Sequence, residues 1–158
     1  MKDSYVTERD RTHIPEEYKW DLTDIYQDDA AWTEAKQKLI AEFPALPAFR
    51  NKLSQSPNHL LDCLKLLERL KKECTRLACY ASMKSDLDTR DSVYLAMDQE
   101  MSRIGSDLAS LASFIEPEIL SAGSEKIAAF IEQEPQLAVY RHILEDILRK
   151  RDHTRSES

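Results

Sequence analysis

Two long stretches of the chain repeat apolar residues at the spacing of an amphipathic helix. The first stretch places them at steps of three and four, or combinations of these, at Leu60, Leu64, Leu67, Cys74, Leu77 and Ala81, joined by Cys63 and Leu70. The second has the same steps at Val93, Met97, Met101, Ile104, Leu108, Leu111 and Ile115. Because residues at these steps share one face of a helix, the pattern predicts two long helices, each with one buried face.

The ends of these two helices are marked by capping residues and prolines. Ser56-Pro57 begins the first helix, since a hydroxyl caps a helix and proline is accepted in its first turn. We expect this helix to end near Ser85, and Glu116-Pro117 to end the second. The short break between them holds three aspartates that suit helix capping, Asp86, Asp88 and Asp91. Helices joined by a short connection favour an antiparallel arrangement.

Shorter helices are predicted on both sides of this pair. The first begins at Asp28 and Asp29, follows the apolar positions Trp32, Ala35, Leu39, Ile40 and Phe43, and is ended by Pro44 and Pro47. A short helix is expected around 49–53, and Ser124 is expected to cap another that Pro135 breaks. A last helix follows Leu137, Tyr140, Leu144 and Ile147 and ends near Lys150.

The pattern predicts an all-α fold, a helical bundle with two long antiparallel helices, shorter C-terminal helices and an N-terminal segment packed on it. Residues 1–14 are expected to form a flexible arm, 15–150 a single helical domain and 151–158 a frayed tail. Gly105 lies inside the second long helix, where glycine costs about 1 kcal/mol relative to alanine. A close crossing of helices would explain it.

The composition narrows the classes of function. The only glycines among the 158 residues are Gly105 and Gly123, so glycine-rich phosphate and dinucleotide loops are absent. The formal net charge of −7 disfavours nucleic acid and anionic membranes as partners. No apolar stretch approaches the roughly 18 residues that span a bilayer. An odd number of cysteines, without a Cys-x-x-Cys pair, favours free thiols in a reducing cytoplasm.

The sequence offers few groups for catalysis or metal binding. None of the histidines, at positions 13, 59, 142 and 153, is followed by glutamate, so the zinc motif His-Glu-x-x-His is absent. His142 and Asp146 are one helical turn apart, which suits either two metal ligands or a hydrogen bond on a helix surface. Cys79 is a conceivable nucleophile with His59 or His142 as its base, against the alternative of a buried structural thiol. We assign no catalytic, cofactor-binding or metal-binding residue to the chain.

Five segments, in the same order, resemble segments of oligoendopeptidase F, a zinc metallopeptidase related to thimet oligopeptidase. The first is Tyr18-Lys19-Trp20-Asp21-Leu22-Thr23-Asp24-Ile25-Tyr26, which resembles the N-terminal signature of that family. The others are Phe49-Arg50-Asn51-Lys52-Leu53, with asparagine where the family has glycine, the stretch from Tyr80 to Asp91, Phe114-Ile115-Glu116-Pro117-Glu118-Ile119, and Tyr140-Arg141-His142. The resemblance extends from about Pro15 to Thr154, nearly the whole chain.

This resemblance implies a helical, non-catalytic N-terminal lobe. Such enzymes hydrolyse oligopeptides in a deep cavity between helical lobes, and one zinc ion is held by a His-Glu-x-x-His helix and a glutamate towards the C-terminus. The motif glutamate activates the zinc-bound water, whose pKa the metal lowers. Since none of those residues lies in this chain, the lobe is expected to be inactive alone and to wall the substrate cavity in the complete enzyme.

Two hypotheses of function remain open from the sequence: the N-terminal lobe of such an enzyme, and an independent helical protein-interaction module. An expressed fragment, a truncated frame and a split gene product would each give this chain. In the first hypothesis the partners are the missing C-terminal catalytic domain and, in the full enzyme, an oligopeptide. Candidate inter-domain contacts are the large apolar residues of the N-terminal segment, Trp20, Leu22, Ile25 and Tyr26. They either cover the chain's own bundle or face the partner, and in the second case the isolated lobe exposes a patch that favours self-association.

Overall fold

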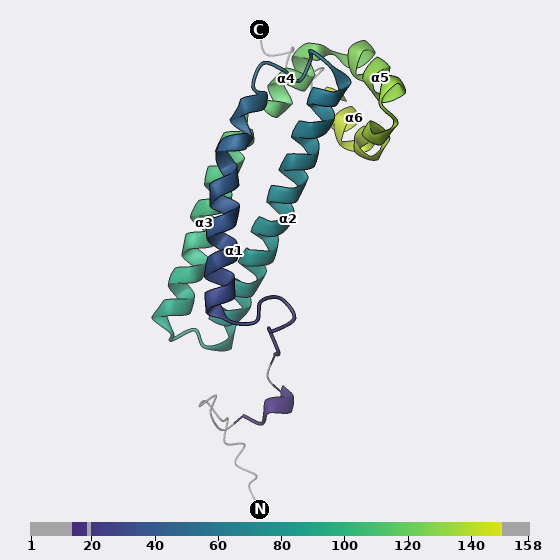
Figure 1. Ribbon diagram of the computed structural model, residues 1–158. Coiled ribbons are helices and arrows are strands. Elements are labelled where there is room, and N and C mark those ends of the chain that lie inside the picture. The colour runs from purple at the N-terminus through teal and green to yellow at the C-terminus, as the bar shows by residue number, and fades with distance from the viewer. Residues whose placement is uncertain (1–13, 19, 150–158) are drawn as a thin grey trace, which may run out of the picture.

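Three helices running side by side form the body of the molecule. The computed structural model describes residues 14–18 and 20–149, so the expected arm and tail lie outside it except at Ile14. After a 3₁₀ turn, η2 (Glu16–Tyr18), come α1 (Asp29–Glu42), α2 (Pro57–Leu87) and α3 (Ser92–Ala112). Helix α2 packs most extensively against α3 and also contacts α1 (Figure 1). The four residues between α2 and α3 reverse the chain, which confirms that the two long helices are antiparallel.

The remaining helices gather at the end of the bundle where α2 begins (Figure 1). They are α4 (Ile115–Ala122), α5 (Ser124–Gln133), the 3₁₀ helix η5 (Pro135–Tyr140) and α6 (Arg141–Arg149). Two further 3₁₀ turns, η3 (Phe43–Ala45) and η4 (Pro47–Phe49), follow α1. No strand occurs in the described part of the chain, so the all-α prediction is confirmed.

One continuous hydrophobic core joins both ends of the molecule. It includes Leu22 and Tyr26 of the N-terminal segment, Trp32 of α1 and Leu144 of α6, each less than a tenth exposed. The N-terminal segment is therefore packed on the bundle, as the sequence predicts. The α2 stripe is buried at Leu60, Leu70 and the other predicted positions, apart from Leu67, which is half-buried.

Three sequence expectations for α3 and its neighbour are wrong. Val93 is 62% exposed, because the first turn of α3 lies beside the reversal at the end of the bundle, where few elements surround it. Glu116-Pro117 does not end α3, which already ends at Ala112; Pro117 lies in the first turn of α4, where its missing N–H costs nothing. No helix crosses closely at Gly105, since a Cβ built there meets no atom within 4 Å.

Other boundaries also differ from the expectation. Helix α5 begins at Ser124 but Gly123 is its cap, with a φ of 82° that glycine adopts readily. The final helix is preceded by the 3₁₀ turns of η5 rather than being one α-helix from Leu137. The short helix expected at 49–53 is replaced by η4 and a series of turns.

A glutamate of α4 fixes those turns. The Glu118 carboxylate accepts hydrogen bonds from the backbone N–H of Asn51, at 2.5 Å, and of Leu53, at 3.3 Å. Asn51 has a φ of 64°, in the left-handed region that glycine and asparagine enter most easily. This explains why asparagine stands here where the resembling segments have glycine. Two of the five resembling segments thus meet at one joint, where the Arg50 guanidinium also lies 5.2 Å from the centre of the Phe114 ring.

The position of the stripe on α2 yields a prediction for stability. Leu70 is 1% exposed, so Leu70→Ala should lower the free energy of unfolding by about 2–5 kcal/mol through lost burial and a residual cavity. Val93→Ala is the control, and it should change that free energy by less than about 0.5 kcal/mol because the side chain is already in water. Urea denaturation followed by circular dichroism measures both. Equal effects of the two variants would contradict this assignment of the core.

Candidate functional site

A groove of about 680 Å³ lies at the end of the bundle where α2 turns into α3. One wall is the N-terminal segment, with Trp20, Leu22 and Tyr26, and the other is the end of α2, with Tyr80 and Lys84. Leu87, the last residue of α2, and Tyr94 of α3 complete the apolar lining. Two sequence segments more than fifty residues apart, 18–26 and 80–91, therefore meet at one surface feature.

Local hydrogen bonds shape the N-terminal wall of the groove. The Thr23 backbone N–H and hydroxyl both donate to Asp21 Oδ1, at 2.9 and 2.7 Å, and these bonds lower the pKa of the Asp21 carboxyl. The following turn is closed by the N–H groups of Ile25 and Tyr26, which both donate to the carbonyl of Leu22. This turn directs Leu22 and Tyr26 into the core, where each is 7% exposed.

Tyr26 fastens this wall to the middle of α2. Its ring stands edge-on to the Tyr80 ring, with centroids 5.5 Å apart, and its hydroxyl donates to Glu73 Oε1 at 2.5 Å. Burial, followed by the bond to Glu73, raises the pKa of the Tyr26 hydroxyl. The Arg76 guanidinium lies 4.6 Å from the centre of the Tyr26 ring and donates to the carbonyl of Ile25. The segment is thus held by apolar, hydrogen-bonding and cation–π contacts together.

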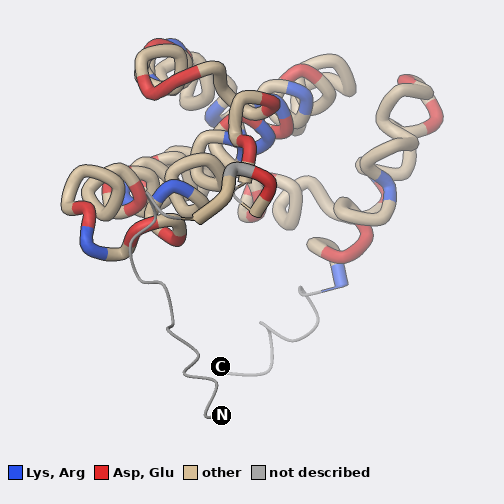
Figure 2. Tube along the Cα trace, turned by 90° about the horizontal axis from the view of Figure 1, so that it is seen from below, with Lys and Arg blue, Asp and Glu red and all other residues tan. Residues whose placement is uncertain are grey.

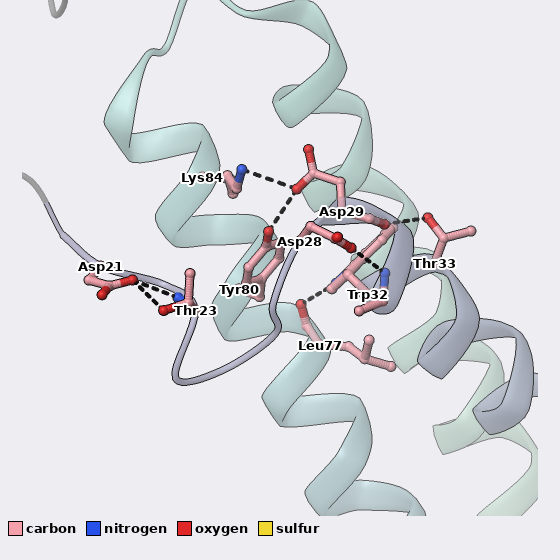
Figure 3. A network of polar contacts seen from close by, with 10 residues as sticks. Asp21, Thr23, Asp28, Asp29, Trp32, Thr33, Leu77, Tyr80 and Lys84 are labelled. Carbon is pink, nitrogen blue, oxygen red and sulfur yellow. Dashed lines mark hydrogen bonds and ion pairs between the residues drawn. The ribbon is translucent and has the colours of Figure 1, made fainter.

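Asp29, Tyr80 and Lys84 form a connected polar cluster in the groove (Figure 3). The Tyr80 hydroxyl donates to Asp29 Oδ1 at 2.7 Å, and the Lys84 ammonium pairs with the same oxygen at 3.1 Å. Burial and the Asp29 carboxylate raise the pKa of Tyr80 to about 12. Burial alone would lower the pKa of Lys84, but Asp29 and the two neighbouring tyrosines raise it. The Lys84 ammonium also lies 5.4 and 4.9 Å from the ring centres of Tyr80 and Tyr94.

The groove is acidic at its rim. Among the residues that the structure describes, 14–18 and 20–149, the lining includes one basic residue, Lys84, and five aspartates, Asp21, Asp28, Asp29, Asp88 and Asp91. Asp28 and Asp91 are the N-caps of α1 and α3, accepting from the N–H groups of Ala31 and Val93 at 2.8 Å each. In the view onto this end of the bundle, acidic and basic positions are both scattered among the helices (Figure 2). The whole sequence has 29 Asp and Glu against 22 Lys and Arg, so the excess of carboxylates is proportionally larger among the described lining residues of the groove.

The structure separates the four candidate contact residues into two pairs. Leu22 and Tyr26 belong to the chain's own core, whereas Trp20 is 55% exposed and Ile25 is half-buried. Sequence reasoning did not identify Asp29 and Lys84 as members of the polar cluster in the groove, and it assigned Tyr80 only to packing. For Tyr80 and Lys84 the signal was the resembling segment that begins at Tyr80, whose polar residues have no role in a helix stripe, whereas Asp29 lies outside all five segments.

The other groups considered for chemistry have structural surroundings. Cys63 and Cys74 are buried, and burial raises the pKa of both thiols, to about 12 at Cys63. Cys79 is exposed, so the alternative of a buried structural thiol at this position is wrong. Cys79 and His59 lie twenty residues apart on one helix, so roughly 30 Å separates them and they do not form a catalytic pair. His142 Nε2 lies 3.4 Å from Asp146 Oδ2 on the surface of α6, with the histidine side chain 82% exposed.

The described residues hold neither a group of metal ligands nor a membrane-spanning helix. Among residues 14–18 and 20–149, nowhere do three or more His, Cys, Asp or Glu side chains come together as metal ligands would. No helix in that part of the chain has the length and apolar character to cross a bilayer. Asp91 caps α3, as the sequence predicts, and Asp88 forms an ion pair with Arg90 at 2.9 Å. Asp86 lies inside α2 and not in the break where the sequence placed it, because α2 continues to Leu87.

The chain is similar to known peptidases over most of its length. A family model described as Oligopeptidase F matches residues 118–158. Oligopeptidase PepF of Bacillus subtilis is 33% identical over 148 residues, which are 94% of this chain and 22% of that protein. Group B oligopeptidase PepB of Streptococcus agalactiae is 28% identical over 94% of this chain and 25% of its own length.

Two solved structures are also similar to this chain. The crystal structure of oligoendopeptidase-F from Enterococcus faecium matches 80% of this chain with a TM-score of 0.72 and 28% identity. A protein of Chlamydophila abortus matches 94% of this chain with a TM-score of 0.82 and 26% identity. In both cases the match covers 25% of the solved chain. This chain therefore spans about a quarter of the length of the proteins it resembles.

The raised pKa of the buried Tyr80 hydroxyl predicts how the stability of the fold changes at alkaline pH. Its pKa in the folded chain, about 12, lies above the ordinary value of 10, so folding is favoured fully below pH 10 and loses this contribution as pH rises towards 12. In Tyr80→Phe this loss is removed, so the free energy of unfolding should fall less steeply between pH 10 and 11.5 than in the parent. Urea denaturation at several pH values measures the slopes. If the free energy of unfolding falls equally steeply with pH in the parent and in Tyr80→Phe, the pKa of Tyr80 is the same in the folded and unfolded chain.

Proposed function

Since the chain is a homologue of the N-terminal helical domain of oligoendopeptidase F, we propose that it is the non-catalytic N-terminal lobe of an oligopeptide-hydrolysing zinc metallopeptidase. In that enzyme it would form part of the wall of the substrate cavity. The strongest support is how much of each protein the matches cover. They include 94% of this chain but only 22% to 25% of the length of the relatives. A helical body whose described residues bring no group of metal ligands together suits a part that shapes a cavity for chemistry performed elsewhere.

The proposal assigns zinc and hydrolysis to the part of the enzyme outside this chain. The described residues do not suit the metal, because the nearest approach to a ligand set is His142 with Asp146, two groups on an exposed helix surface. Catalytic zinc usually takes three protein ligands in a site that excludes most of the solvent. We further propose a cytoplasmic location, on the free cysteines at 63, 74 and 79.

The proposed contact with the rest of the enzyme centres on the N-terminal segment. Of the four candidate residues, Trp20 and Ile25 retain apolar surface that a partner can bury, and Leu22 and Tyr26 hold the segment in place from the core side. An exposed tryptophan on a fixed segment is a favourable anchor, because little conformational entropy remains to be lost when it is buried. In the isolated lobe the same surface favours self-association.

A chimera tests the proposed role. We would replace the matching segment of the Bacillus subtilis relative with this chain and measure cleavage of a quenched fluorescent peptide. The chimera should cleave the peptide in a chelator-sensitive reaction, whereas this chain alone should show neither stoichiometric zinc after dialysis nor turnover. A chimera that folds with the helicity and zinc content of the parent but has no activity would contradict the role of this lobe.

Trp20→Ala tests the contact. Burial of a large apolar side chain contributes about 1.5–3 kcal/mol, so the variant should weaken association of the lobe with the rest of the enzyme at least roughly tenfold. The helicity of the isolated lobe should not change, since Trp20 is 55% exposed there. Tyr18→Ala is the control, an aromatic residue that is 74% exposed and outside the candidate set. If both variants associate as tightly as the parent, Trp20 is not at the interface.

A further inference from the structure

The groove at the end of α2 has the size and lining of a site for a short chain segment. Its volume of about 680 Å³ lies within the range of roughly 300–1,000 Å³ that is typical of ligand pockets. Its described lining combines six apolar or aromatic residues with eight polar or charged ones, and Trp20 has more than half of its surface in water. The opposite wall is fixed by the core, because Tyr80 is 2% exposed.

Lys84 shows which chemical group this lining suits. Its ammonium lies over the rings of Tyr80 and Tyr94 and pairs with the Asp29 carboxylate. Rings attract cations through their negative faces, and carboxylates add the opposite charge. The groove therefore already holds one cation between aromatic rings and a carboxylate.

The remaining charges of the groove favour another cation. Asp29 is matched by Lys84 and Asp88 by Arg90. The other three lining aspartates, Asp21, Asp28 and Asp91, use a carboxylate oxygen to accept hydrogen bonds from neighbouring backbone N–H groups, and they retain a net negative charge. A basic group entering beside Trp20 would thus meet a tryptophan face and an excess of negative charge.

We propose that this groove binds a lysine or arginine side chain of an oligopeptide where the lobe meets the rest of the enzyme, with one face of Trp20 packed over the stem or head of that side chain and the other left for the contact with the partner. The inference rests on the proposed function, because it assigns a substrate chemistry to the lobe of an oligopeptidase. The volume suits one or two side chains of a peptide. A second copy of this chain is a poorer occupant, since two chains of net charge −7 repel each other.

The test uses this chain and two peptide probes. The first probe is an acetylated alanine peptide with two arginines, and the second carries citrulline, which is neutral and of the same shape, in their place. Nuclear magnetic resonance follows the two tryptophan indole N–H signals. The Trp20 signal should shift and saturate with the arginine peptide, whereas the Trp32 signal should not, because that N–H is buried and bonded to the carbonyl of Leu77. Citrulline should weaken binding about three- to tenfold.

Matched variants separate this groove from general charge attraction. Asp28→Asn with Asp91→Asn removes two groove charges while keeping both helix caps, because asparagine caps as well as aspartate does. It should weaken arginine-peptide binding about three- to tenfold. Asp62→Asn with Glu132→Gln makes the same change in net charge at exposed positions outside the groove, and it should leave binding unchanged. Trp20→Leu should weaken binding by a similar factor, and it does not alter either helix cap. Because this variant lacks the Trp20 signal, its binding is followed at the backbone amide signal of Thr23.

Several results would overturn the inference. They are equal binding of the two probes, equal weakening by the two double variants, and no saturable shift up to about 10 mM peptide. A Trp20 signal that moves with protein concentration alone would identify a second copy as the occupant. The chimera reports on the proposed function separately: an active chimera with no peptide binding by the groove rejects only this inference, and an inactive chimera with binding rejects only the lobe's role.

Discussion

The rest of the structure depends on the burial of one face of α2. This 31-residue helix contacts α1, α3, α5 and η5, so it is the common wall of both ends of the molecule. Its apolar stripe extends from Leu60 to Ala81 without a charged interruption, and the residues on the opposite face are solvated. In a folded protein most of the stability of an amphipathic helix comes from tertiary packing of its apolar face, so the surface that α2 buries against its neighbours supplies most of the stabilisation.

Tyrosine hydroxyls fasten other elements to this wall. Tyr26 and Tyr140 approach α2 from the two termini of the described chain and donate to Glu73 and Glu68, each at 2.5 Å. Tyr80 lies on α2 itself, and its hydroxyl donates to Asp29 at the start of α1. In each case an aromatic ring contributes apolar burial and its hydroxyl contributes a charge-assisted hydrogen bond. Such pairs define the orientation of a segment more closely than apolar contact does.

These joints relate the resembling segments to the proposed role. Segments that are far apart in sequence meet in pairs, 18–26 with 80–91 at the groove and 49–53 with 114–119 at Glu118. Most of their residues therefore maintain the shape of the lobe, and a smaller set remains on the surface. At the groove that set is Trp20, Tyr94 and the aspartates of the rim. A lobe that walls a cavity needs this combination of a rigid body and a few exposed recognition groups.

The sequence by itself determined the two long helices and their pairing, and it indicated the helices that begin at Asp29 and Ser124, but not α4. Spacing of apolar residues and the Ser56-Pro57 cap are local properties, so they placed α2 to within two residues at its C-terminal end. The resemblance, read from short motifs, also indicated the family. Local pattern failed where a boundary depended on neighbours: Pro117 inside α4 and Val93 in solvent are positions whose environment is set by other elements.

Only the tertiary structure decided which residues form the groove. Trp20, Leu22, Ile25 and Tyr26 are alike in sequence as large apolar residues, but the turn at Asp21 sends two of them into the core and leaves Trp20 outside. Asp29 and Lys84 are 55 residues apart and become partners because α1 begins beside the end of α2. Such contacts depend on distances between helices, which no local spacing encodes, since they arise from the packing of whole faces against one another.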